Sequence, residues 1–335
     1  MKRIASFLFA LALVLSLAAC TVPVEKADDG KIQIVATLFP YYDFARAIVG
    51  DRADVTLLLS PGREAHSFEP TPLDAVTISE ADVFLYNGGE GEYWVESMLD
   101  AAGENIAVVA RMMDYVDALN EEYVEGMQGA DGHDHDHEHG SHDDHDHDHE
   151  EDEHDSDEIE YDEHIWTSPK NAVVLCRAVC GAICRADAEN AAFYRANCEN
   201  YCAQLEDLDA RFAALCESAP RRLLIFADRF PMLYFCREYG LDYRAAFHGC
   251  SGDTEPSLAT IKFLIDKVED ENIPVVYTID FGTKKVAAVV SECTGAAIET
   301  LYSMQTVSRA DFDAGETYLT LMERNFEALR KGLNA

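Results

Sequence analysis

Basic residues are scarce in this sequence. Its 335 residues include 26 Lys and Arg against 63 Asp and Glu, so the formal net charge is −37 at pH 7. Proteins that hold nucleic acid through its phosphates carry a basic face, and the charge therefore excludes that class of partner. It does not indicate an unfolded chain, because 48% of the residues are hydrophobic and 10% are aromatic. The length predicts about two domains.

Several catalytic motifs are also missing. The sequence contains no H-E-x-x-H, G-x-S-x-G, G-x-G-x-x-G or P-loop pattern, so we expect no enzyme, with a metallohydrolase as the catalytic alternative. Nor do any two of the ten cysteines have the spacing C-x-x-C, which excludes zinc-finger and thioredoxin-type sites.

The cysteines do not form the pattern of a disulfide framework. Two groups of them recur every four residues, which places each group on one helix face, where small buried thiols pack as hydrophobes. These groups are Cys176, Cys180 and Cys184, and Cys198 and Cys202. A single bridge between Cys250 and Cys293 stays open as an alternative.

Long apolar runs are limited to the start of the chain. Three residues with two positive charges precede an apolar stretch at 4–17, which is too short to span a bilayer as a helix. It ends in Leu-Ala-Ala-Cys, and small residues before a Cys resemble the bacterial lipobox. We therefore expect a lipoprotein signal peptide at 1–19, a lipidated Cys20 and a tether at 20–30. The protein is then extracytoplasmic and lipid-anchored to the bacterial cell membrane; an ordinary signal peptide is the alternative.

Residues 131–158 hold 15 of the 63 acidic residues, nine of the 12 histidines and no Lys or Arg. Such a segment cannot bury enough apolar surface to offset its ordering entropy, so we expect a disordered loop. Imidazoles that alternate with carboxylates bind zinc, copper and nickel weakly, and we predict an accessory metal-binding tract. A plain solvated linker is the alternative. The histidines of the tract are His133, His135, His137, His139, His142, His145, His147, His149 and His154.

Short apolar runs alternate with helical patterns through the rest of the chain. Runs of strand length without polar alternation are typical of parallel strands covered on both faces. They lie at 32–36, 55–59, 83–86 and 106–109, and again at 223–226, 243–247, 275–279 and 297–301. The pattern predicts an α/β fold with two Rossmann-like domains.

Helical patterns occupy the intervals between these runs. They cover 42–49 and 72–79 in the first half, and Ser168 followed by Pro169 is typical of a helix start. We expect Asp187 to cap a longer helix that runs to about Glu217. A last helix is expected from about Gly315 to Leu333.

These elements divide the chain as follows. We expect an N-terminal α/β domain at 31–186, which contains the disordered loop at about 120–160. A linking helix follows at 187–218, and a C-terminal α/β domain at 219–335. Ligands of open α/β sheets bind beyond the carboxyl ends of the strands, so the cleft between the domains is the expected site.

Five polar residues lie near expected strand ends or helix starts. Two Asp residues leave apolar strands at the carboxyl end, where a buried charge needs a partner or a cation. A lone His is more often a structural residue than a ligand, but His and Asp at matching positions in two domains predict a metal site. The residues are His66, His164, Asp228, His248 and Asp280.

Several long motifs resemble the zinc and manganese substrate-binding lipoproteins of ATP-binding-cassette importers. The segments are PGREAHSFEPTPLD, ISEADVFLYNGGEGEYWV and DEHIWTSPKNA, followed by REYGL, DTEPS and the acidic end of VVYTID. The resemblance covers about residues 31–335 apart from the acidic tract. A His-rich loop is typical of the zinc-binding, ZnuA-like branch. The resemblance implies two α/β domains linked by a long rigid helix, with the metal in the interdomain cleft.

The resemblance also implies metal ligands. His66 and His164 match the first two His ligands, and Asp280 falls where some members have a carboxylate, usually Glu. At the third position the family spacing points to Arg229, which cannot bind a cation. A shift of one residue gives Asp228.

We therefore predict His66, His164, Asp228 and Asp280 as ligands, with His248 as the substitute candidate. Two His and two carboxylates suit Mn²⁺ as well as Zn²⁺, and the His tract favours Zn²⁺. The expected function is to capture Zn²⁺ outside the cell as a monomer and deliver it to the permease of an importer. An Mn²⁺ carrier is the first alternative. A surface metal buffer or adhesin, in which only the tract matters, is the second.

Overall fold

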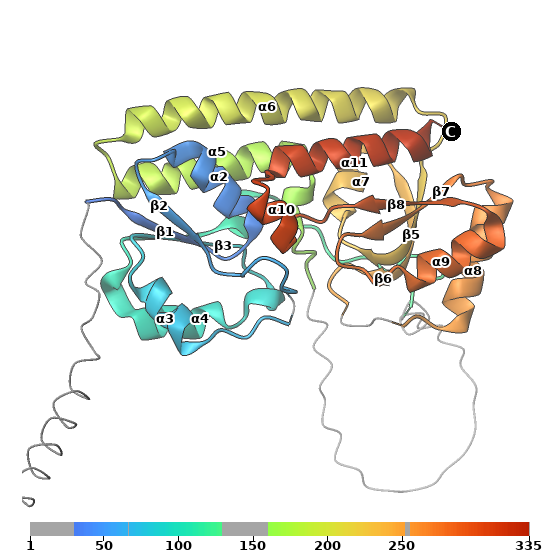
Figure 1. Ribbon diagram of the computed structural model, residues 1–335, viewed down its shortest axis with the longest axis horizontal. Coiled ribbons are helices and arrows are strands. Elements are labelled where there is room, and N and C mark those ends of the chain that lie inside the picture. Colours follow the sequence, from blue (N-terminus) through green and yellow to red (C-terminus); the bar gives the residue numbers. More distant parts are fainter. Residues whose placement is uncertain (1–29, 66, 129–159, 252–254, 335) are drawn as a thin grey trace, which may run out of the picture. The chain divides into compact units, whose positions relative to one another are not determined.

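Two four-stranded parallel sheets form the framework of the computed structural model, which describes residues 30–65, 67–128, 160–251 and 255–334 (Figure 1). The first sheet has the order β2-β1-β3-β4 and the second the order β6-β5-β7-β8. The strands are β1 (Gln33–Ala36), β2 (Asp54–Leu57), β3 (Val83–Tyr86), β4 (Val108–Arg111), β5 (Leu223–Phe230), β6 (Asp242–His248), β7 (Val275–Ile279) and β8 (Ala297–Leu301). The predicted α/β class is confirmed.

Helices lie between the strands and across both sheets. The first sheet is accompanied by α2 (Phe39–Val49), α3 (Pro72–Ser79) and α4 (Val95–Ala102). The second is accompanied by α7 (Leu233–Tyr239), α8 (Leu258–Asp270), α9 (Lys285–Thr294), α10 (Arg309–Asp313) and α11 (Tyr318–Leu333). Between them come α5 (Pro169–Ala186) and α6 (Ala191–Ser218).

The long helix α6 contacts elements of both halves. Its 28 residues are about 42 Å long at 1.5 Å per residue. The Tyr201 hydroxyl donates to Asp43 Oδ2 of α2 at 2.6 Å, and Arg211 Nη2 donates to Glu323 Oε2 of α11 at 2.7 Å. In Figure 1, α6 runs beside α5 and α11 above the sheets. The helix therefore holds the two sheets in one packed body.

One predicted helix cap is wrong. Asp187 does not begin α6 but follows the last residue of α5, and α6 begins at Ala191 after Asn190. The Asp187 carboxylate accepts from the Asn190 backbone N–H at 3.2 Å and from the Tyr194 hydroxyl at 2.7 Å. Its side chain thus stabilises the turn between the two helices. The sequence suggests an N-cap at this position because an N-cap also uses a carboxylate as hydrogen-bond acceptor.

Other helix ends agree more closely with the sequence. Ser168 Oγ accepts from the Asn171 backbone N–H at 3.3 Å, with Pro169 in the first turn, as predicted. The predicted bounds of α3 are confirmed. The last helix begins at Tyr318, later than expected, because Thr317 caps it and the separate helix α10 precedes it.

Buried cysteines line the α5–α6 interface, as expected. Cys176, Cys198 and Cys202 are at most 2% exposed, and all nine described cysteines carry free thiols. The alternative of a bridge between Cys250 and Cys293 is therefore wrong for this structure.

Several predicted features lie outside the described residues. They are the signal peptide at 1–19, Cys20, nearly all of the tether, His66 and the nine histidines of the tract. The predicted loop at about 120–160 is described only at its ends, where Asn120 pairs with Tyr161 in an antiparallel bridge. Within the described ranges, no helix is both long enough and apolar enough to cross a membrane.

Candidate metal centre

His164 is buried and held by a carboxylate. It stands just before a short 3₁₀ helix (Ile165–Thr167) and is 1% exposed. Its Nδ1 lies 3.1 Å from Asp162 Oδ1, and its backbone N–H donates to the same oxygen at 2.8 Å. When Nδ1 carries the proton toward Asp162, Nε2 keeps the lone pair that a metal ligand needs. Burial opposes protonation of the ring, but the charge and hydrogen bond of Asp162 outweigh it and raise the pKa of His164.

Both sheets contribute to fixing the His164 segment. The Asn87 side chain, after β3, donates to the Glu163 carbonyl at 3.0 Å. The Tyr234 hydroxyl of α7 donates to the Asp162 carbonyl at 2.8 Å, and Trp166 Nε1 donates to the Ser303 carbonyl at 2.8 Å. Residues from both halves of the fold thus hold the segment by hydrogen bonds, which fixes the position of the imidazole.

Asp228 lies within a strand rather than at its end. We expected the strand to stop at Phe226, but β5 continues to Phe230, with a register shift between Phe226 and Arg229. Asp228 Oδ1 accepts from the Arg229 backbone N–H at 2.9 Å, and Oδ2 accepts from the Ile279 backbone N–H at 3.3 Å. Burial raises the pKa of the Asp228 carboxyl.

Asp280 follows β7 directly, as predicted. Its Oδ1 accepts from the Ser303 backbone N–H at 3.1 Å. Burial raises the pKa of this carboxyl to about 6, against the hydrogen bonds that lower it. Each Asp therefore has a backbone donor, and among the described residues no Lys, Arg or His side chain is hydrogen-bonded to either carboxylate, so each would gain from a cation.

A small cavity of about 10 Å³ lies between the His164 segment and the ends of β5 and β7. His164 and Gly249 line it together with Glu64, Arg229 and Phe281. Arg229 Nη2 lies 3.0 Å from Glu64 Oε2, so this ion pair connects β5 to the loop that precedes His66. The pair also explains what Arg229 does at the position where the family resemblance would place a ligand.

His248 has a different partner. Its Nδ1 lies 2.9 Å from Glu121 Oε1, which also accepts from the Cys250 backbone N–H at 3.1 Å. Burial raises the pKa of Glu121, but the hydrogen bond and charge of His248 outweigh it and leave that pKa lowered. His248 is not among the residues that line the cavity beside His164.

The predicted ligands are not brought into one coordination sphere within the described residues. There, the single group of three His, Cys, Asp or Glu side chains with ligand atoms within 4.8 Å of one another consists of cysteines. His66, the fourth predicted ligand, lies outside the described residues. The four-ligand site stays a prediction.

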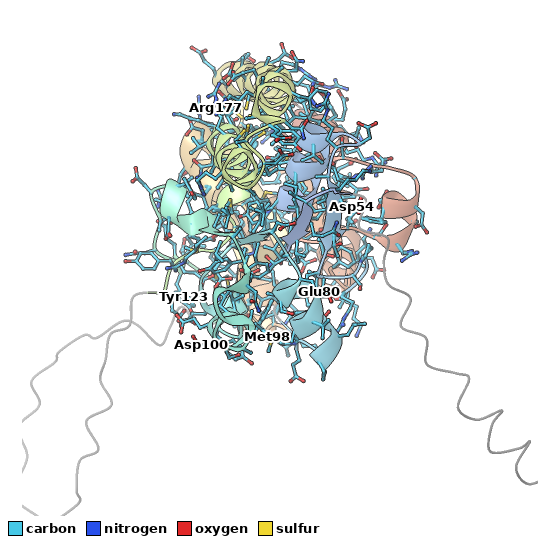
Figure 2. The ribbon with its side chains drawn as sticks, turned by 90° about the vertical axis from the view of Figure 1, so that its left-hand side faces the viewer. Asp54, Glu80, Met98, Asp100, Tyr123 and Arg177 are labelled. Atoms are coloured by element: carbon cyan, nitrogen blue, oxygen red, sulfur yellow. The ribbon has the colours of Figure 1, made fainter. Side chains whose placement is uncertain are left out.

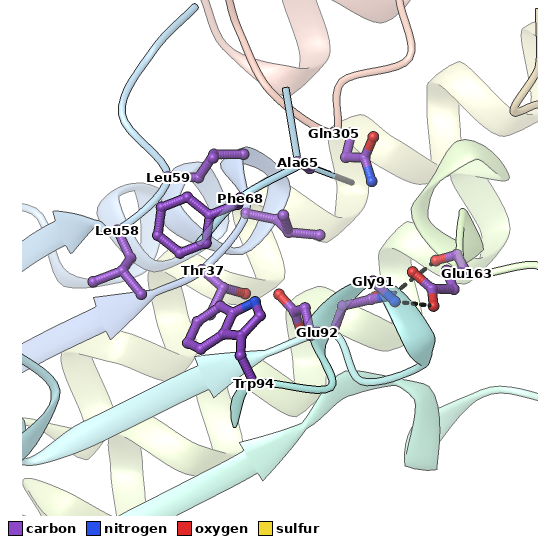
Figure 3. Close-up of a pocket in the computed structure, with 12 residues that line it drawn as sticks. Thr37, Leu58, Leu59, Ala65, Phe68, Gly91, Glu92, Trp94, Glu163 and Gln305 are labelled. Carbon is purple, nitrogen blue, oxygen red and sulfur yellow. Dashed lines mark hydrogen bonds between the residues drawn. The ribbon is translucent and has the colours of Figure 1, made fainter. Parts of the chain in front are cut away.

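A second cavity, of about 20 Å³, lies beside the same segment (Figure 3). It is lined by Phe68, Glu92 and Trp94, and also by Glu163, whose Oε1 accepts from the Gly91 backbone N–H at 2.7 Å. Burial raises the pKa of Glu92 to about 7. This cavity therefore places a carboxyl that can exchange a proton near neutral pH close to the predicted ligand loop.

Sequence reasoning missed several residues that shape this region. They are Glu64, Glu92, Glu121, Asp162 and Ser303. Asp162 had a signal, because an acid two residues before a His can reach its Nδ1. The others act through contacts between distant segments and carry no local signal.

The family described as zinc-uptake complex component A, periplasmic, matches residues 34–332. This chain belongs to that family. It is 30% identical over 306 residues to the high-affinity zinc uptake system protein ZnuA of Bacillus subtilis, which covers 90% of this chain and 88% of that protein. It is 29% identical over 334 residues to the zinc-binding lipoprotein AdcA of Streptococcus pneumoniae, and spans 61% of AdcA.

Solved structures of the zinc-uptake family have the same fold. The metal-dependent lipoprotein YcdH from Bacillus subtilis superposes with a TM-score of 0.72 at 29% identity, covering 90% of this chain and 100% of that one. The Zn(II)-bound ZnuA-like domain of Streptococcus pneumoniae AdcA gives 0.71 at 25% identity, covering 91% and 100%. The predicted family and the fold with two parallel-sheet domains are confirmed, and the family is one of solute-binding proteins.

Proposed function

We propose that this protein captures Zn²⁺ on the outer side of the membrane and delivers it to the permease of an ATP-binding-cassette importer. The observation that carries the proposal is the state of His164. The ring is buried, held at Nδ1 by Asp162, and set in the wall of a cavity that is also lined by Glu64, from the loop after β2, and by Arg229 of β5. Membership of the zinc-uptake family supports Zn²⁺ as the cargo.

We assign His66, His164, Asp228 and Asp280 as the ligands. Neutral imidazole and ionised carboxylate are suitable donors for Zn²⁺. Four protein ligands close the coordination sphere and exclude a reactive water, which suits a carrier rather than a catalyst. His248 is the substitute for Asp228, but its contact with Glu121 supports Asp228.

The remaining parts of the chain take supporting roles in this proposal. Cys20 anchors a monomer to the membrane through lipid, and the tract at 131–158 collects cations loosely near the site. The domains at 31–186 and 219–335 hold the metal between them, and the helix at 187–218 limits their relative motion.

Zinc titration tests the assignment. A variant that lacks 131–158 is titrated in competition with a zinc chelator, alone and with His164→Ala or His248→Ala. We expect one tight site in the parent, a loss of at least about 100-fold in affinity for His164→Ala, and little change for His248→Ala. Full-affinity binding by His164→Ala would refute the site. Loss of all tight binding on deletion of the tract would instead favour a metal buffer.

Metal identity is tested separately. Crystals grown with equal Zn²⁺ and Mn²⁺ are measured at the absorption edges of both metals. We expect anomalous density at the zinc edge, between His164 and Asp280. Density that appears on crossing the manganese edge and does not increase across the zinc edge would make this chain an Mn²⁺ carrier.

A further inference from the structure

Five cysteines converge between α5 and α6, away from the zinc site proposed above. Cys176 on α5 and Cys198 and Cys202 on α6 have sulfur atoms that all lie within 4.8 Å of one another. The Sγ atoms of Cys198 and Cys202 are 3.9 Å apart. All three side chains are buried, so the cluster is closed to solvent. Figure 2 views the two helices nearly end-on, with Arg177 labelled on α5.

The spacing of the sulfurs suits a metal better than a disulfide. Three sulfurs around one ion at about 2.3 Å are about 4 Å from one another. A disulfide needs sulfurs about 2.05 Å apart, and the described cysteines form none. Cys198 and Cys202 are also one turn apart on the same helix, where side chains lie side by side and can share a ligand.

We propose that Cys176, Cys198 and Cys202 form a second metal site, which binds one soft cation, Cu(I), in a three-coordinate sulfur environment. Thiolates select soft ions such as Cu(I). Zn²⁺ in structural sites takes four ligands, and this group supplies three. The thiols of Cys198 and Cys202 also donate to the Cys176 and Val173 carbonyls of α5, at 3.8 and 3.9 Å, and Ala or Val at these positions would supply neither these contacts nor a metal ligand.

Two further cysteines connect the cluster to the surface. Cys184 is only half-buried, and its Sγ lies 3.9 Å from Cys180 Sγ. Cys180 in turn interacts electrostatically with Cys198. On this proposal Cu(I) passes from sulfur to sulfur, from Cys184 through Cys180 to Cys198. Two cysteines outside the site thus have a role in loading it.

The charge balance of binding involves no redox step. Copper arrives already reduced, and each thiol that binds it releases its proton to solvent. Three thiolates and one Cu⁺ leave a charge of −2 among buried side chains. Arg177 on α5 interacts electrostatically with Cys202, and Arg195 on α6 with Cys180 and Cys184. Arg177, which is also paired with Glu206 at 3.0 Å, offsets part of the charge of the site, and Arg195 lies beside the proposed loading path.

Titration with Cu(I) under anaerobic, reducing conditions tests the site in the full chain. A chromophoric Cu(I) chelator buffers the free ion at a level too low to fill the His tract. We expect one Cu(I) per chain, and a loss of at least about 100-fold in affinity for Cys198→Ala. Cys216→Ala removes another buried thiol of α6 and serves as the matched control, with unchanged affinity expected.

X-ray absorption of the wild-type chain with one equivalent of Cu(I) keeps the proposal testable if Cys198→Ala fails to fold. We expect three sulfur neighbours at about 2.3 Å. Nitrogen or oxygen neighbours, or equal Cu(I) affinity in Cys198→Ala, would overturn the proposal. Cys184→Ala should slow loading several-fold and leave the final stoichiometry at one. An unchanged loading rate would remove Cys184 from the path. Zinc binding is unaffected in either case, because the two sites share no ligand.

Discussion

At the scale of single residues, Asp162 orients the predicted metal ligand His164. It is 1% exposed and bonds both the ring and the backbone of His164. A carboxylate behind a ligating His fixes the tautomer and the ring orientation, and its removal weakens metal binding by about 10–100-fold in other proteins. Asp162 is therefore expected to act on zinc without touching it.

Replacing Asp162 with Asn tests this role. We expect zinc affinity to fall by about 10–100-fold while the fold is retained, because the amide keeps the size but not the charge of the carboxylate. The pKa of metal-free His164 should fall, since Asp162 supplies the charge that raises it. Competition titration and NMR of the histidine ring measure the two effects. Asp207→Asn, on the exposed face of α6, is the control, and equal affinities in the two variants would contradict the prediction.

At the scale of secondary-structure elements, the sequence predicted the strands well and their ends less well. β3, β7 and β8 have the predicted bounds, since their apolar runs end in turn residues. β5 runs four residues further than predicted. The reason is that Asp228 and Arg229 are polar but find partners, in the backbone of Ile279 on the neighbouring strand β7 and in Glu64 of the loop after β2. Polar residues inside a strand end the sequence pattern without ending the strand.

The bulge of β5 around Asp228 depends on a glycine in the neighbouring turn. A Cβ added at Gly282 would lie 1.7 Å from Asp228 Oδ2. Gly282→Ala should therefore destabilise the protein by about 1–3 kcal/mol, through displacement of Asp228, and weaken zinc binding as well. Urea unfolding of the metal-free protein and zinc titration measure the two effects.

Gly181 provides the matched control for this change. It lies in the middle of α5, and a Cβ there would meet only Arg185 Nη1, at 3.8 Å. Gly181→Ala should stabilise the protein by about 0.5–1 kcal/mol, because Ala favours the helix. If both variants shift the free energy of unfolding in the same direction, a clash between the added Cβ and Asp228 does not explain the effect of Gly282→Ala.

At the scale of the whole molecule, α6 and the His164 segment determine how the two sheets face each other. The apolar periodicity of α6 predicted where the helix ends but not that it begins at Ala191, and no local pattern predicted that Tyr201 would reach Asp43 or that Trp166 would reach Ser303. Both contacts join segments more than 130 residues apart. The candidate site forms where loops distant in the sequence approach one another. The residue types could therefore be predicted from local sequence, but the partners that they contact could not.

The pH dependence of zinc binding follows from this arrangement. Binding requires neutral His164 and ionised Asp280, and the pKa of each is raised in the metal-free fold, to about 6 for Asp280. Protons therefore compete with zinc, and affinity should fall by at least about 30-fold between pH 7.5 and 5.5. In Asp280→Asn we expect weaker binding at pH 7.5 and a shallower fall, because one competing proton is gone. Asp100→Asn, an exposed site on α4, should behave as wild type.

Asp280 should make the metal-free protein more stable as the pH falls, whereas the affinity for zinc decreases as the pH falls. A carboxyl whose pKa is raised by folding binds its proton more tightly in the folded state, so its contribution to stability grows as pH falls from about 6 to about 4. Zinc at 100 times its pH 7.5 dissociation constant adds about 2.7 kcal/mol at pH 7.5, and a loss of affinity of about 30-fold should reduce this increment to about 0.9 kcal/mol at pH 5.5. Urea unfolding with and without zinc at both pH values separates the two effects. A zinc increment that is equal at the two pH values would mean that neither His164 nor Asp280 binds the metal.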